Sequence, residues 1–217
     1  MISTARRFIF LHAPKTGGNS MQLMLQPHSD DELVTRARRD RTHRFGVRGP
    51  VTPHKHATLK AYAKALEGDL EGWRIVLAAR DPLARAVSYY FSPHRWGEPD
   101  GAGGTWTNPP VWDREAFLAM LPEMTTLAEF VTMDGRVCDP DHLIRQEHLA
   151  EDFAAFVRAT GLPLDASALP RLNSSAADPA LRARALADPV ACDAVRLRFA
   201  ADYELLQGWS RRLASGA

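Results

Sequence analysis

The chain has 217 residues, 45% of them hydrophobic and 24% charged, with a formal net charge of +1. This length and composition predict one domain over residues 1–217, and the nearly neutral balance argues against a nucleic-acid partner. The two cysteines, Cys138 and Cys192, form no C-x-x-C pair, so we expect neither a disulfide framework nor a zinc site. Because no stretch approaches the roughly 20 apolar residues of a membrane span, we expect a cytoplasmic protein.

The first predicted elements surround a glycine-containing loop. The apolar run 8–11 fits a buried strand, residues 13–20 read Ala-Pro-Lys-Thr-Gly-Gly-Asn-Ser, and apolar spacing over 21–25 predicts a helix. Loop N–H groups beside glycine and the positive end of a helix dipole attract an anion. Lys15 adds a mobile charge, and the threonine and serine add hydroxyl donors. We interpret this segment as a phosphate or sulfate site, since an ordinary strand–helix turn requires neither the lysine nor both glycines.

Two further segments precede the next predicted strand. Residues 36–48 carry six arginines against one acid, which fits either a solvated surface loop or a clamp for an anionic acceptor or donor. Residues 53–56 read Pro-His-Lys-His and are followed by apolar residues at helical spacing. A histidine can accept a proton from an alcohol, although a lone histidine is more often structural. A metal pair is not favoured, because no acidic or cysteine ligand lies nearby with suitable spacing.

The run 74–79 predicts a second buried strand, which ends at Arg80-Asp81-Pro82. Asp81 can cap a helix and Pro82 suits its first position. Arg80 follows the carboxyl end of a strand, where open α/β sheets place their ligands, and its fork can grip a phosphate. Ser88 lies about two helical turns further on. Taken alone, an arginine and a serine at this spacing mean little, and a structural salt bridge is the better interpretation.

The remainder of the chain continues the alternation of strands and helices. Residues 92–112 are rich in glycine and proline and hold three tryptophans, which could stack on an acceptor or pack the loop down. We predict a third strand at 141–146, a helix from Leu149, and a helical C-terminal segment over 189–206. This order predicts a three-layer α/β fold with a small central parallel sheet flanked by helices.

Two motifs together resemble a known family. Pro-Lys-Thr-Gly-Gly-x-Ser after the first strand resembles the 5′-phosphosulfate loop of sulfotransferases, which use 3′-phosphoadenosine 5′-phosphosulfate as donor. Arg-Asp-Pro-x-x-Arg-x-x-Ser-Tyr-Tyr over 80–90 is similar to the 3′-phosphate motif of the carbohydrate branch. The lysine precedes the glycines, unlike the G-x-x-x-x-G-K-[ST] loop of nucleoside triphosphatases. The resemblance implies a P-loop-like fold and a single sulfotransferase domain over 1–217.

The resemblance assigns donor binding to residues of the two motifs: Lys15, Thr16, Gly17, Gly18, Asn19, Ser20, Arg80 and Ser88. Asn19 departs from the usual threonine, but its amide can still donate to phosphate. The His-x-His segment resembles the acceptor-activating pair of the heparan-sulfate 2-O-sulfotransferase branch. It makes His56 the first choice for general base and His54 the second, with His12 as the main rival.

Later segments also resemble the family in order: a strand followed by Gln-Glu-His-Leu over 143–149, a late Asn-Ser loop at 172–175 that approaches the donor, and a terminal helix around 202–206. The implied reaction is in-line transfer of a sulfuryl group to a hydroxyl of a glycan or other hydroxylated metabolite, with Lys15 stabilising the leaving phosphate and no metal required. An ordinary histidine pKa predicts turnover that rises through about pH 6–7. A non-catalytic polyanion-binding protein and a nucleotide kinase remain as alternatives. The acceptor and the oligomeric state stay open.

Overall fold

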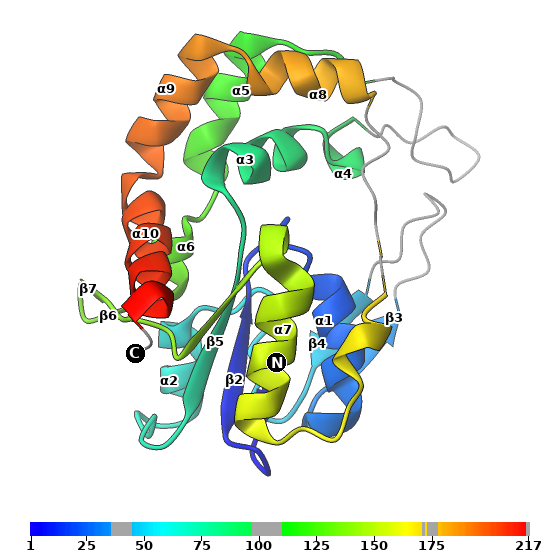
Figure 1. Cartoon of the computed structure of the whole chain (residues 1–217), viewed down its shortest axis with the longest axis vertical. Coiled ribbons are helices and arrows are strands. Elements are labelled where there is room, and N and C mark those ends of the chain that lie inside the picture. Colours follow the sequence, from blue (N-terminus) through cyan, green and yellow to red (C-terminus); the bar gives the residue numbers. More distant parts are fainter. Residues whose placement is uncertain (36–44, 97–109, 171, 173–177, 216–217) are drawn as a thin grey trace.

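The computed structural model describes residues 1–35, 45–96, 110–170, 172 and 178–215 (Figure 1). Its centre is a sheet in the order β1–β2–β5–β8, formed by Ile2–Ser3, Phe8–His12, Arg74–Ala79 and His142–Arg145. Strands β2, β5 and β8 are parallel, with Leu11 opposite Leu77 and Leu77 opposite Leu143. The prediction of an α/β fold is thereby confirmed.

The sheet is mixed, so the prediction of a purely parallel sheet was wrong. Strand β1 pairs antiparallel to β2, with Ile2 opposite Ile9. The connection over residues 4–7 is a tight turn in which Arg7 adopts a positive φ of 53°. A connection this short can only return the chain antiparallel, because a parallel partner needs a crossover of a dozen or more residues.

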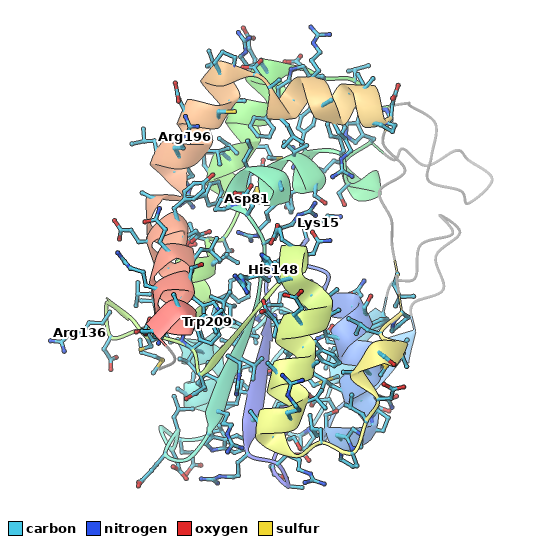
Figure 2. The ribbon with its side chains drawn as sticks, in the orientation of Figure 1. Lys15, Asp81, Arg136, His148, Arg196 and Trp209 are labelled. Atoms are coloured by element: carbon cyan, nitrogen blue, oxygen red, sulfur yellow. The ribbon has the colours of Figure 1, made fainter. Side chains whose placement is uncertain are left out.

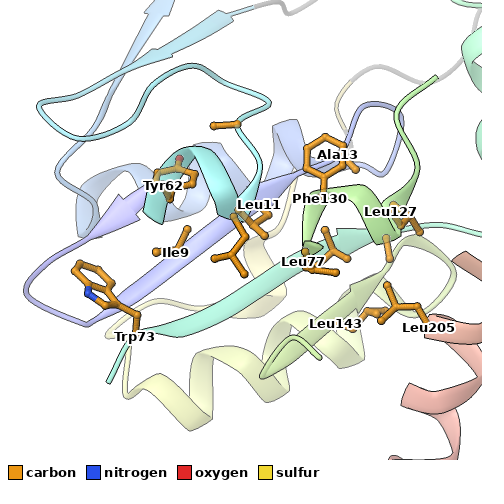
Figure 3. Close-up of a cluster of buried hydrophobic side chains, with 14 of the residues drawn as sticks. Ile9, Leu11, Ala13, Tyr62, Trp73, Leu77, Leu127, Phe130, Leu143 and Leu205 are labelled. Atoms are coloured by element: carbon orange, nitrogen blue, oxygen red, sulfur yellow. The ribbon is translucent and has the colours of Figure 1, made fainter. Parts of the chain in front are cut away.

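Helices cover both faces of the sheet, because side chains alternate along each strand. On one face, Phe8 and Phe10 of β2 pack with α1 (Gly18–Leu25) and α7 (Leu149–Thr160). On the other face, Ile9 and Leu11 pack with α2 (Leu59–Ala65), α6 (Leu127–Phe130) and α10 (Ala200–Ser215), as Figure 3 shows. The central layer is therefore buried from both sides.

A further group of helices lies beyond the carboxyl ends of the strands (Figure 1). It contains α3 (Pro82–Tyr90), α5 (Arg114–Met120), α8 (Pro179–Leu186) and α9 (Pro189–Arg198), which share a core of their own, and the short α4 (Pro93–Trp96). Helix α3 begins as predicted: the Asp81 carboxylate accepts a hydrogen bond from the Ala84 N–H at 2.8 Å, and Pro82 takes the first position.

The remaining elements are short. Two hairpins pair β3 (Glu32–Thr35) with β4 (Phe45–Arg48) and β6 (Thr132–Met133) with β7 (Arg136–Val137). Single 3₁₀ turns occur at Gln26–His28, Leu121–Glu123, Gln146–His148 and Ala166–Ala168. Among the described residues, no helix is both long and apolar enough to cross a membrane.

The predicted helical segment 189–206 is two helices rather than one. Helix α9 ends at Arg198 and α10 begins at Ala200, because Phe199 (φ −113°, ψ 28°) leaves the helical conformation. Phe199 is buried in the core that α3, α5, α8 and α9 share, whereas Leu205 is buried against the sheet. The break lets one segment pack into both cores.

Candidate functional site

The carboxyl ends of the three parallel strands meet in a small region between the sheet and α3. The Arg80 guanidinium, after β5, donates to the Lys15 carbonyl, after β2, at 3.3 Å. The Asp81 N–H donates to the Glu147 carboxylate, after β8, at 3.0 Å. Figure 2 shows Lys15, Asp81 and His148 in this region. The two predicted anion motifs, whose Lys15 and Arg80 are 65 residues apart, are therefore neighbours in the fold.

Residues 14–18, which we call the anion loop, have a backbone that requires glycine. Gly17 has a φ of 79°, a conformation that side chains disfavour, and it is the residue that precedes α1. A Cβ at Gly18 would lie 2.2 Å from the His12 ring, so no side chain fits there. Lys15 also has a positive φ, of 71°. The sequence pattern that predicted a tight loop here corresponds to a real conformational demand.

Thr16 acts within the loop. Its hydroxyl is fully buried and donates to the Ala13 carbonyl at 2.7 Å, so in this conformation its proton is not directed at a ligand. No side chain in the described part of the chain caps α1, whose first N–H groups therefore carry the positive end of the helix dipole. The Ser20 hydroxyl accepts a hydrogen bond from the Leu172 N–H at 3.3 Å. That contact brings the start of the late loop to α1, while residues 173–175 lie outside the described part.

Lys15 and Arg80 bring two cations to this region. The Lys15 ammonium donates to the hydroxyl of the buried Ser92 at 3.2 Å. The Nε of Arg80 is buried and has no hydrogen-bond partner among the described residues. Burial lowers the pKa of Arg80, and the Glu147 carboxylate opposes that shift. A half-buried guanidinium whose Nε has no partner among the described residues is suited to an anionic ligand. Ser88 is buried on α3, the helix that begins two residues after Arg80.

The histidines differ sharply in their surroundings. His56 is packed edge to face on His12, with ring centroids 4.7 Å apart, and its Nδ1 lies 2.7 Å from the His12 carbonyl oxygen. A carbonyl can only accept, so Nδ1 carries the proton and Nε2 of the neutral ring holds a free lone pair. Burial, the largest cause, lowers the pKa of His56 to about 4. His54 is exposed, which sets it apart from the other two.

His12 is almost fully buried at the end of β2. Its Nδ1 pairs with the Gln22 amide oxygen at 2.9 Å, and burial holds its pKa well below the usual range. Its ring fills the space beside Gly18, and its carbonyl accepts from His56. His12 thus shapes both the anion loop and the orientation of His56.

Arg85 is a residue of this region to which the sequence analysis gave no role. It is 1% exposed, and its guanidinium donates to the carbonyls of Pro14 at 3.0 Å and Thr125 at 2.7 Å. It also lies 3.7 Å from the buried Asp202 carboxylate, which accepts from the N–H groups of Leu127 and Ala128. Arg85 therefore ties the anion loop to α6 and α10. Its place as the second arginine of the Arg-Asp-Pro-x-x-Arg motif was the available signal.

A pocket of about 500 Å³ opens on one side of this region, where Asp81, Glu147 and His148 line it. It is bounded by the residues that follow β8 and by α10, and it is lined by Asp81, Arg145, Glu147, His148, Tyr203, Leu206, Gln207, Ser210 and Arg211. Arg145 is committed to Asp152 through two hydrogen bonds of 2.8 Å. None of the residues assigned by the resemblance lines this pocket.

The structure describes only part of the arginine-rich segment 36–48 and of the tryptophan-containing segment 92–112, whose roles the sequence left open. Arg36, Arg38, Arg39, Arg41 and Arg44 lie outside the described residues, and Arg48 on β4 is paired with Glu32 at 2.6 Å. Trp96 and Trp112 both pack on Tyr90, each with ring centroids 5.5 Å away, which favours a packing role for these two; Trp106 lies outside the described residues.

Among the residues that the structure describes, no group of three or more His, Cys, Asp or Glu side chains could hold a metal ion. Compared with protein-family models, curated proteins and solved structures, the chain gives no significant match.

Proposed function

We propose that the protein is a sulfotransferase domain of P-loop-like fold that transfers a sulfuryl group from 3′-phosphoadenosine 5′-phosphosulfate to a hydroxyl. The observation that carries the proposal is the hydrogen bond from Arg80 to the Lys15 carbonyl. It places two anion motifs of different sequence and different chain position side by side. A donor with phosphate groups at both ends of its ribose needs two neighbouring anion sites.

The two ends of the donor have separate binding residues in this proposal. The 5′-phosphosulfate lies on the anion loop, where the N–H groups at the start of α1 and the Lys15 ammonium face it. The 3′-phosphate is held by Arg80, just before α3, and by Ser88, on α3. The unused buried Nε of Arg80 supports this assignment, since a charged donor left without a partner is costly.

His56 is the proposed general base. Its Nε2 takes the proton of the acceptor hydroxyl while the hydroxyl oxygen forms a bond to sulfur. The bond from sulfur to the bridging phosphate oxygen breaks, and adenosine 3′,5′-bisphosphate leaves with the electron pair. Lys15 and the loop N–H groups stabilise the charge that grows on that oxygen, as in phosphoryl transfer. The products are a sulfate ester and the bisphosphate.

Two observations bear on the alternatives. A nucleotide kinase of the P-loop type carries its lysine after the glycines of the phosphate loop, whereas Lys15 precedes Gly17 and Gly18. Arg48, the described arginine of the 36–48 segment, is paired with Glu32 on the surface of the β3–β4 hairpin, which is an ordinary surface ion pair and not by itself a sign of a polyanion site. The sulfotransferase remains the function that the arrangement supports best.

Incubation of the protein with donor labelled in the sulfuryl group, together with glycan and metabolite extracts, tests the proposal. We expect a labelled sulfate ester and equimolar bisphosphate, formed equally well with a metal chelator present and lost in Lys15→Ala. Labelled product that depends on added magnesium, or no product while the protein binds polyanions in a salt-sensitive way, would contradict it.

A further inference from the structure

Gln22 is a fully buried polar residue of α1 to which neither the sequence motifs nor the proposed reaction gives a role. Its neighbours on the helix, Met21 and Leu25, pack into the apolar core between α1 and the sheet. Its amide oxygen accepts a hydrogen bond from Nδ1 of His12 at 2.9 Å, whereas its amide nitrogen has no partner among the described residues. A buried amide with an unpaired N–H group is costly, so packing alone would favour an apolar side chain. The bond to His12 therefore distinguishes glutamine at this position.

The His12 ring is held on two sides by α1. Gln22 fixes its Nδ1, and the bare Cα of Gly18 lies against the ring, since a Cβ there would be 2.2 Å from it. Both residues belong to the helix into which the anion loop leads. The position of the His12 ring is therefore set by the helix start that receives the phosphosulfate in the proposed function.

The His12 ring in turn limits how the imidazole of His56 can rotate. The 2.7 Å bond from Nδ1 of His56 to the His12 carbonyl oxygen fixes the direction of that N–H group, but it allows the ring to rotate about the N–H axis. Such a rotation would swing Nε2, which lies off the axis. The edge-to-face packing of the two rings, with centroids 4.7 Å apart and planes at 62°, opposes this rotation. The direction in which Nε2 points therefore depends on the His12 ring.

We propose that Gln22 is a positioning residue of the reaction: it holds the His12 ring, which orients Nε2 of His56 toward the acceptor hydroxyl. This inference rests on the proposed function and adds to it a residue outside both sequence motifs. A base that is displaced by about an ångström accepts the proton less readily, because proton transfer needs hydrogen-bond reach and alignment. Gln22 is not among the residues that bind the donor, so its loss should lower turnover and leave nucleotide binding intact.

Replacement of Gln22 by methionine tests this role. Gln22→Met keeps the length of the side chain and removes the amide, and Gln26→Met makes the same change at an exposed position one helical turn later. Gln22→Asn, which withdraws the amide by one methylene, is a second variant. Turnover is measured with labelled donor and a fixed amount of the glycan and metabolite extract. It is divided by the number of sites that titrate with adenosine 3′,5′-bisphosphate in calorimetry, so unfolded protein does not count.

In Gln22→Met and Gln22→Asn we expect turnover per site to fall about tenfold with bisphosphate affinity unchanged, while Gln26→Met keeps the wild-type value. Because Gln22 acts through His56, Gln22→Met should cost nothing further in a His56→Ala background. Wild-type turnover in Gln22→Met, an equal loss in both backgrounds, or a matching loss of bisphosphate affinity would overturn this role and leave the proposed function standing. Absence of labelled product with the wild-type protein would overturn the proposed function and the role of Gln22 with it.

Discussion

At the scale of single residues, the hydrogen bond from His56 to the His12 carbonyl fixes how the imidazole can act. The bond holds the proton on Nδ1 and leaves Nε2 as the basic nitrogen. Burial favours the neutral ring, which is the form that a general base requires. The burial that makes His56 a weak base also keeps its ring neutral, and so able to accept a proton, at neutral pH.

The pH dependence of turnover follows from this shift. The pKa of His56 is lowered to about 4, so the ring is neutral well above that value and becomes protonated only as pH falls through it. We expect kcat/KM, which reports the free enzyme, to stay flat from about pH 6 to 8 and to fall below about pH 5. This differs from the limb at about pH 6–7 that an ordinary histidine predicts, because sequence alone does not show burial. NMR titration of the His56 ring identifies the group that causes the acid limb of the kcat/KM profile. A limb near pH 6.5 that coincides with protonation of His56 would contradict the account.

Replacement of His56 separates chemistry from donor binding. His56→Ala should lose roughly 10²–10⁴-fold in turnover, the usual contribution of a positioned base. Bisphosphate affinity should barely change, because the contacts assigned to the nucleotide come from other segments. The exposed His54 provides the control, and His54→Ala should be milder. Full activity in His56→Ala beside an inactive His54→Ala would move the base to His54.

Lys15 is expected to act mainly on the transition state. In the proposed reaction, its charge faces the bridging oxygen, on which negative charge grows as the sulfur–oxygen bond breaks. Lys15→Ala should therefore reduce turnover much more than it reduces bisphosphate affinity. Both quantities are measured on the same preparation. Equal losses in the two would show that Lys15 only binds the ground state.

At the scale of elements, Arg85 links the anion loop to three helices. It extends from α3 to the Pro14 and Thr125 carbonyls and to Asp202 on α10. Burial lowers the pKa of Arg85 to about 10, so the group remains charged at neutral pH. A buried charge of this kind contributes geometry more than net stability, provided that its partners stay in place.

Removal of one charge from the buried Arg85–Asp202 pair should lower the stability of the fold. Arg85→Ala leaves the buried Asp202 carboxylate without its counter-charge, and we expect the free energy of unfolding to fall by roughly 3–5 kcal/mol. The double variant Arg85→Met with Asp202→Leu should recover part of that loss, because it removes both charges. Urea denaturation measures both changes. A loss below about 1 kcal/mol in Arg85→Ala would show that the pair does not anchor the loop.

At the scale of the whole molecule, much of the layout was predictable from local patterns. Strand β5 covers the predicted residues 74–79, and α3 begins at Pro82 because Asp81 and Pro82 are strong local signals. The two-residue β1 was missed, since a strand of that length has no periodicity to detect. The break at Phe199 was missed because it depends on which of two cores each residue enters.

In the candidate site, too, local features could be predicted from the sequence and contacts between distant segments could not. The motifs predicted which residues lie at the carboxyl ends of β2 and β5, because strand ends can be placed from sequence. Three contacts join distant segments: Arg80 donates to the Lys15 carbonyl, His56 packs edge to face on His12, and Arg85 extends to Asp202 on α10. Single-sequence patterns do not specify such contacts.

Recognition of both ends of one nucleotide is the central claim, and the binding of adenosine 3′,5′-bisphosphate beside adenosine 5′-monophosphate tests it most directly. By calorimetry, we predict that the wild-type protein binds the bisphosphate far more tightly. Arg80→Ala should lose about 2–4 kcal/mol of that binding and leave the monophosphate affinity unchanged, because only the 3′-phosphate loses its charged partner. Equal affinity of the wild-type protein for the two nucleotides would contradict the account.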